Sequence, residues 1–222
     1  MFEGAHTALV TPFNEKGMID PDAFRALIDR QFDGGIKGIV PCGTTGESST
    51  LSTEEHHLVI EMAVKQARKR GLVIAGTGSN STREAIDLTQ AAEKAGADAA
   101  LLVTPYYNKP SQEGLYQHYK AIALSTDLPL MLYSIPGRCH IQIDVETCVR
   151  LAHDCPNIKA IKEAGGVTER VRQLRAALPA EFEILSGDDA LTVDFMKEGA
   201  VGVVSVAGNL IPGPMADLTR AM

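Results

Sequence analysis

The chain has 222 residues, of which 45% are hydrophobic and 22% charged, enough to fill one large core or two small ones. Its formal net charge is −7 and its basic residues do not cluster, so neither nucleic acid nor an anionic membrane is expected as a partner. No apolar run has the length of a membrane span, and the N-terminus carries no signal-peptide pattern.

The cysteines favour a reducing compartment. The chain has 4 cysteines, and no two of them form a CxxC pair. Such isolated cysteines in a chain of ordinary composition are typical of reduced thiols in or near a core. We therefore expect a cytoplasmic protein with four free thiols, at Cys42, Cys139, Cys148 and Cys155.

Short apolar runs alternate with helical patterns along the whole chain, and no low-complexity segment or linker divides it. The runs are continuous rather than alternating, which is typical of parallel strands buried on both faces. In chain order, the strands are expected over residues 7–11, 38–42, 73–77, 99–104, 129–133, 159–162, 183–186 and 201–206.

The helices between these strands have recognisable ends. Asp20 followed by Pro21 predicts a capped helix start, and the pair Gly34 and Gly35 predicts its end. Two later starts fit the capping box, in which a serine and a glutamate satisfy each other's free backbone N–H groups: Ser52 with Glu55, and Ser81 with Glu84. The last helix is expected to begin near Pro214.

About eight strands alternating with helices predict an α/β fold of the (β/α)8 type, a TIM barrel, as a single domain over residues 1–222. A doubly wound open sheet is the alternative, but it would need fewer strands and usually a phosphate-binding fingerprint. Neither GxGxxG nor a Walker pattern occurs. Because the chain stops at Met222, the last barrel helix is expected to be short or incomplete.

A lysine near the end of the sixth strand is the most informative single residue. In a barrel of this type the reactive groups lie at the carboxyl ends of the strands. In IKAIKEAGG, strand alternation places Ile158, Ala160 and Lys162 on one face. If that face points inward, desolvation lowers the pKa of Lys162 and makes its amine a nucleophile for carbonyl groups. The alternatives are a lysine that reaches the rim, or one paired for structural reasons with an acid such as Asp188.

Other polar groups follow neighbouring strands. Tyr133 ends the fifth strand and could pass protons beside an amine, or could be a core tyrosine bonded to backbone. Thr44 and Thr45 stand between Gly43 and Gly46, in a loop that could bind a small carboxylate or could be only a tight turn. Arg138 follows a Pro-Gly turn and could grip a carboxylate, or could be a surface arginine.

Several stretches together resemble dihydrodipicolinate synthase, a family of the wider group of Schiff-base aldolases and lyases that includes N-acetylneuraminate lyase. The resemblance covers essentially the whole chain, and the Pro-Gly-Arg turn is what separates the synthases from the lyases. The matching pieces are ALVTPF (8–13), GIVPCGTTGES (38–48), VTPYYNKPSQEGLYQHY (103–119), YSIPGR (133–138), IKEA (161–164) and LSGDD (185–189).

The resemblance implies a condensation of pyruvate with aspartate semialdehyde on the diaminopimelate route to lysine. Lys162 would form an imine with pyruvate, and Tyr133 would pass protons. No metal or organic cofactor is implied, because the protonated imine is itself the electron sink. Thr45 would relay protons together with a neighbouring subunit's copy of Tyr107, and Thr44 and Thr45 would hold the pyruvate carboxylate. Arg138 would receive the carboxylate of aspartate semialdehyde, and Gly187 and Val204 would line the pocket.

The family resemblance also implies a regulatory site and an oligomer. In some members the end product lysine inhibits at a site between subunits, and the matching positions here are Ser49, His56, Asn80, Glu84 and Tyr106. A second histidine expected in inhibited members is replaced by Thr53, which argues against tight inhibition. Glu84 could equally serve only its capping box. A homo-oligomer, a dimer or a tetramer, is expected because Tyr107 would act on a neighbouring subunit.

Two departures from the family pattern bear on function. Ser134 and Ile135 stand where many members have Asn and Val, which keeps the side-chain size. The family's helical extension beyond the barrel is expected to be missing from this chain, which would expose apolar surface. The alternative functions are a different pyruvate-dependent Schiff-base aldolase or lyase that acts on a sugar acid, and a shortened, non-catalytic member of the family.

Overall fold

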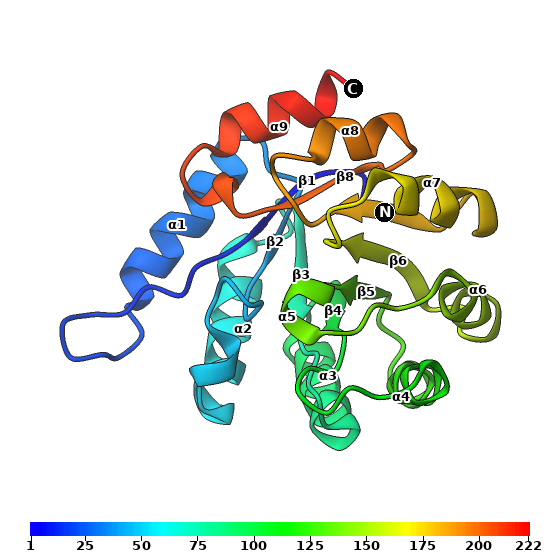
Figure 1. Cartoon of the computed structure of the whole chain (residues 1–222). Helices are drawn as coiled ribbons and strands as arrows, with labels where there is room; N and C mark the ends of the chain where they lie inside the picture. The colour runs from blue at the N-terminus through cyan, green and yellow to red at the C-terminus, as the bar shows by residue number, and fades with distance from the viewer.

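A computed structural model describes all residues from 1 to 222 and shows eight parallel strands that close into a barrel in the order of the chain (Figure 1). Each strand pairs with the next, and β8 pairs with β1 to complete the ring. The strands are β1 (Gly4–Ala8), β2 (Gly38–Val40), β3 (Leu72–Gly76), β4 (Ala99–Val103), β5 (Leu130–Ser134), β6 (Ile158–Glu163), β7 (Glu183–Ser186) and β8 (Gly202–Ser205). The prediction of a TIM barrel is confirmed, and the open sheet is wrong.

A ring of helices surrounds the barrel, while the one-turn helix α5 lies over its mouth (Figure 1). The helices are α1 (Pro21–Asp33), α2 (Thr53–Ala67), α3 (Thr82–Ala95), α4 (Gln112–Ala123), α5 (Pro136–Cys139), α6 (Val145–Asp154), α7 (Thr168–Ala177), α8 (Thr192–Lys197) and α9 (Pro212–Arg220), with 3-10 turns η1 (Ser48–Thr50) and η2 (Ala207–Asn209). None of these helices combines the length and the apolar character needed to cross a bilayer.

Helices α1 and α2 start as the sequence signals predict, whereas the starts of α3 and α9 differ from prediction. Asp20 caps α1, and Ser52 with Glu55 forms a complete capping box at α2. The second capping box is wrong in part. Ser81 accepts from the backbone N–H of Glu84, but the Glu84 carboxylate accepts from the hydroxyl of Ser79 instead of turning back to Ser81.

The boundaries at the two ends of the chain also differ from prediction. Helix α9 begins at Pro212, since either proline can occupy the first helical turn, and it has 9 residues. Strand β1 lies three residues earlier than expected because the chain leaves the ladder after Leu9. The backbone N–H of Leu9 still donates to Val40, whereas that of Val10 donates to the side chain of Asn209.

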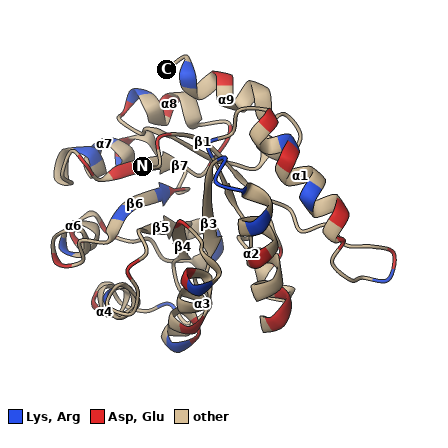
Figure 2. Ribbon diagram, turned by 180° about the vertical axis from the view of Figure 1, so that it is seen from behind, with Lys and Arg blue, Asp and Glu red and all other residues tan.

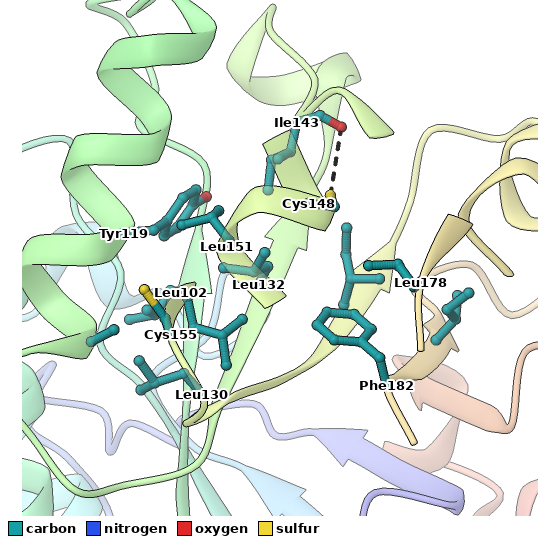
Figure 3. Close-up of a cluster of buried hydrophobic side chains, with 14 of the residues drawn as sticks. Leu102, Tyr119, Leu130, Leu132, Ile143, Cys148, Leu151, Cys155, Leu178 and Phe182 are labelled. Atoms are coloured by element: carbon teal, nitrogen blue, oxygen red, sulfur yellow. Dashed lines mark hydrogen bonds between the residues drawn. The ribbon is translucent and has the colours of Figure 1, made fainter. Parts of the chain in front are cut away.

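Two apolar layers hold the barrel. Inside it, Met131, Ala160, Leu185 and Val204 are fully buried with their neighbours on other strands. Outside it, a 24-residue cluster fills the space between β4–β7 and helices α4, α6 and α7 (Figure 3). Charged residues lie mainly on the outer helices and connecting loops, with both signs interspersed (Figure 2). The four cysteines are buried and free, as predicted.

An irregularity in β6 corrects the predicted alternation. The register between β5 and β6 shifts between Leu130 and Met131, which pair with Ile158 and Ala160. Ile158 therefore belongs to the outer cluster, while Ala160 lies inside the barrel. The expectation that Ile158 shares a face with Lys162 is wrong, because a bulge adds one residue and reverses the alternation before it.

Candidate active site at the carboxyl end of the barrel

Lys162 lies inside the barrel mouth, not at the rim. Its exposed fraction is 4%, and neither a hydrogen bond nor an ion pair engages its amine within the chain. The Nζ atom is 4.1 Å from the centroid of the Tyr133 ring. Burial lowers the pKa of Lys162 to about 8, and the negative charge of Asp189 opposes that effect. About one tenth of this amine is therefore uncharged at pH 7, far more than for a lysine in water.

The neighbouring strands fix the lysine side chain. Lys162 pairs with Tyr133 on β5 and with Leu185 on β7. A Cβ atom at Gly187 would stand 3.0 Å from Lys162 Cε and 2.7 Å from the Cβ of Ala164, so glycine at this position leaves the room that the lysine occupies. The expected pocket residue Gly187 thus lies beside the lysine side chain. Val204, the other one, is fully buried inside the barrel on β8.

A buried ion pair holds the other face of the strand end. Glu163 is fully buried and accepts from Arg170 Nε at 2.8 Å and from the backbone N–H of Gly165 at 2.7 Å. Arg170 also donates to the Ile143 carbonyl. This pair ties β6 to α7 and to the segment before α6. Sequence reasoning missed it, although a glutamate that shares a strand face with Ile161 already signals the need for a buried cation.

Tyr133 is buried beside the amine. Its exposed fraction is 6%, and no backbone group accepts its hydroxyl, which disfavours the core tyrosine bonded to backbone. Burial raises its pKa to about 12, while the charge of Arg138 and the side chain of Thr44 act in the opposite direction. The phenol therefore keeps its proton at neutral pH and can donate it to an oxygen or nitrogen beside Lys162.

The loop after β2, residues 43–48, forms a tight turn in which some backbone N–H groups remain free to bind an anion. The N–H groups of Gly46 and Ser48 donate to the Gly43 carbonyl, so these two groups are used within the turn. Those of Thr44 and Thr45 have no acceptor in the chain. Two backbone donors and two hydroxyls thus remain for a ligand, fewer than a loop of fully convergent N–H groups would offer.

Arg138 and Tyr107 stand apart from the buried centre. Arg138 is exposed at the end of α5, forms no ion pair in the chain, and lines a cavity of about 340 Å³ together with Thr44. Tyr107 is 89% exposed with a positive φ of 73°, so its side chain projects into solvent. The structure of one chain does not bring Tyr107 to Lys162.

The same cavity brings together four of the five residues expected to bind lysine: Ser49, His56, Glu84 and Tyr106. The fifth, Asn80, does not line it, and its carbonyl accepts from the Asn108 side chain. His56 is buried, its Nε2–H donates to the Gly76 carbonyl at 2.8 Å, and its Nδ1 has no partner. Thr53 lies outside the cavity, in a shallow depression beside Glu84.

The family model and the most similar curated relatives describe the same kind of enzyme. A model described as the Dihydrodipicolinate synthetase family matches residues 1–222. The 4-hydroxy-tetrahydrodipicolinate synthase of Geotalea daltonii is 53% identical over 221 residues, which are 100% of this chain and 76% of that protein. Relatives of the same name from Nitratidesulfovibrio vulgaris are about 50% identical and are matched over 75% of their length.

Solved structures of the same kind superimpose closely. That of the synthase from Methylacidiphilum fumariolicum SolV has a TM-score of 0.98 and 55% identity, and the match covers 99% of this chain and 73% of that one. The structure of a synthase from Acinetobacter baumannii complexed with pyruvate has a TM-score of 0.97 and 49% identity, and the match covers 100% of this chain and 76% of that one. The structure of the enzyme from Cyanidioschyzon merolae with lysine bound has a TM-score of 0.96 and 43% identity, and the match covers 99% of this chain and 74% of that one.

Removal of the buried amine should stabilise the fold. We expect Lys162→Met to raise the free energy of unfolding at pH 7 by about 3 kcal/mol, because the amine titrates near 8 when folded and near 10.5 when unfolded. The unfolded wild-type chain binds more protons between those values, so wild-type stability rises with pH there and the gap to the variant closes. Urea unfolding at pH 7 and at about pH 10 measures both effects.

Lys159→Met is the matched control, since Lys159 is exposed on the same strand and its replacement should change the free energy of unfolding by no more than about 0.5 kcal/mol. A Lys162→Met variant no more stable than wild type at pH 7 would show that the amine is not desolvated.

Proposed function

The chain belongs to the dihydrodipicolinate synthetase family, and we propose that it acts as a 4-hydroxy-tetrahydrodipicolinate synthase that condenses pyruvate with aspartate semialdehyde. The observation that carries the proposal is the unpaired amine of Lys162, buried against Tyr133. We propose that residues 1–222 work as one barrel domain, in the cytoplasm, with no metal or organic cofactor in the reaction.

The first chemical step uses the amine. Neutral Lys162 adds to the keto carbon of pyruvate, and the resulting carbinolamine loses water to give a protonated imine. The departing oxygen needs a proton, and the Tyr133 phenol holds one beside Lys162. The positive imine then draws electrons from the adjacent methyl group, whose proton leaves to give an enamine. This enamine carbon attacks the aldehyde of the second substrate.

The loops around the amine provide the carboxylate contacts. We assign the pyruvate carboxylate to the free N–H groups and hydroxyls of Thr44 and Thr45. Gly187 and Val204 would form the wall of this pocket next to Lys162. Arg138, which forms no ion pair in the chain and lines the cavity together with Thr44, would receive the carboxylate of aspartate semialdehyde.

Tyr107 supports an oligomer as the working form. Tyr107 is 89% exposed and has a positive φ, so its side chain is not stabilised by packing against its own chain. We propose that it enters the site of a second copy, in a dimer or a tetramer, and completes a proton relay with Thr45 and Tyr133.

Lysine is the proposed effector of the 340 Å³ cavity. The Glu84 carboxylate can pair with an ammonium group, and the free Nδ1 of His56 and the Tyr106 hydroxyl can bind the other polar groups. Thr44 and Arg138 line the same cavity, so an occupant would contact residues of the proposed active site. A related enzyme has been solved with lysine bound.

The test of the main proposal is a coupled assay of this chain with pyruvate and aspartate semialdehyde, together with borohydride trapping of the pyruvate adduct by mass spectrometry. We expect turnover and a single adduct at Lys162, and neither in Lys162→Ala. A chain that gives no adduct would be a non-catalytic member of the family. An adduct without turnover on aspartate semialdehyde would favour an aldolase or lyase for a sugar acid.

Arg138→Ala should separate the two substrates. We expect kcat/KM for aspartate semialdehyde to fall about 100-fold, the loss expected when a charged pair is removed, and the pyruvate concentration for half-maximal trapping to change less than about twofold. Arg138→Lys is the control that keeps the positive charge but removes the two parallel N–H donors of the guanidinium. Equal losses for both substrates would contradict the assignment.

Glu84→Ala should weaken inhibition by lysine at least about tenfold, because it removes the only carboxylate that lines the cavity. Glu54→Ala, an exposed acid in the first turn of α2, is the matched control and should leave inhibition as in wild type. A wild-type rate that does not fall in millimolar lysine would remove the effector proposal.

A further inference from the structure

Asp189 carries a carboxylate of which one oxygen is bound and the other is free. Its Oδ2 accepts from the backbone N–H groups of Val206 at 3.0 Å and Ala207 at 2.8 Å. These bonds join the loop after β7 to the loop after β8. Its Oδ1 is buried and has no hydrogen-bond partner. A buried oxygen of a carboxylate without a partner is costly and needs an explanation.

The nearby buried group of opposite charge is the amine of Lys162, which also has no partner within the chain. Gly187, two residues before Asp189, borders the lysine side chain, since a Cβ atom there would stand 3.0 Å from Lys162 Cε. Asp189 thus lies in the same short loop as the glycine that borders Lys162, and its negative charge opposes the effect of burial on the pKa of that amine.

Other titratable groups around Lys162 do not supply this charge. On β5 and α5 stand the neutral phenol of Tyr133, the Cys139 thiol, which donates to the Thr104 carbonyl, and the cation of Arg138. On β6 itself, Glu163 points to the other face and is bound by Arg170. After β7, Asp188 accepts from the N–H groups of Ala190 and Leu191. Strand β8, GVVS, has no titratable side chain.

We propose that Asp189 is a positioning residue of the imine step: its free oxygen is the counter-charge for the nitrogen of Lys162, and its bound oxygen holds the β7 and β8 loops around that nitrogen. This inference rests on the proposed function and deepens it. It corrects the sequence-based alternative in which Asp188 was the acid that pairs with Lys162.

The chemistry gives the counter-charge two opposite effects. When the neutral amine adds to pyruvate, the carbon–oxygen π bond breaks. The oxygen takes one N–H proton and one proton from Tyr133 and leaves as water, so the new carbon–nitrogen double bond bears one positive charge on nitrogen. A carboxylate stabilises that cation in a site that excludes water. The same carboxylate also stabilises the ammonium form of the free amine, and so raises the pH at which attack begins.

Asp189→Asn tests both effects, because the amide oxygen can still accept from Val206 and Ala207 while the charge is lost. Borohydride trapping is followed over a pH range that brackets 8, at several pyruvate concentrations. We expect the pH midpoint of trapping to move down by about one unit and the pyruvate concentration for half-maximal trapping to rise about tenfold. Asp188→Asn is the matched control and should change neither.

The outcomes separate the inference from the proposed function. Wild-type chain without any adduct would overturn the proposed function and this inference with it. An adduct in wild type together with an unchanged midpoint in Asp189→Asn would overturn the inference alone. Should Asp189→Asn not fold, as judged by thermal unfolding beside wild type, Asp189→Gln is compared with Asp189→Glu, since these two side chains have the same length and differ in charge, and both are read by the same two quantities. A charge-keeping Asp189→Glu should restore the wild-type midpoint.

Discussion

The removal of one lysine amine from water is the constraint on which this molecule depends. Moving the pKa of Lys162 from 10.5 to about 8 corresponds to a cost of about 3 kcal/mol at neutral pH, a large share of the stability of an ordinary domain. The barrel can carry that cost because the ring of strands encloses its interior laterally. The strands exchange hydrogen bonds around the whole ring, and the packed residues below the amine, Met131, Ala160 and Val204, are fully buried.

Close approaches of backbone allow this packing, and they explain two of the glycines. A side chain at Gly202 would overlap the backbone of Gly4, where β8 meets β1 and the ring closes. Gly187 leaves space for the lysine itself. The buried pair of Glu163 and Arg170 then fixes the end of β6 from outside. The amine is thus held from both faces of its strand, which limits the orientations available to it before any substrate arrives.

The sequence predicted most of the fold because its signals were local. Continuous apolar runs, the Asp20 cap and the Ser52 capping box each depend on a few neighbouring residues, and each is present in the structure. What it could not predict depends on distant partners. The bulge at β6 arises from pairing with β5, and the Glu84 carboxylate turned to Ser79 in place of Ser81. The choice between Asp188 and Asp189 required the position of the β8 loop, which no local pattern contains.

The reaction places two demands on the nitrogen that no uniform environment meets. Attack on a keto acid requires a neutral amine, which burial favours; the intermediate that follows is a cation, which burial opposes. A fixed carboxylate near the buried nitrogen stabilises the cationic intermediate, but it also stabilises the ammonium form and so opposes the formation of the neutral amine. The value of about 8 for Lys162 reflects both forces. A site with burial alone would give a better nucleophile and a less stable imine, so the balance between Asp189 and the surrounding apolar wall sets how readily pyruvate is held and how readily it is released.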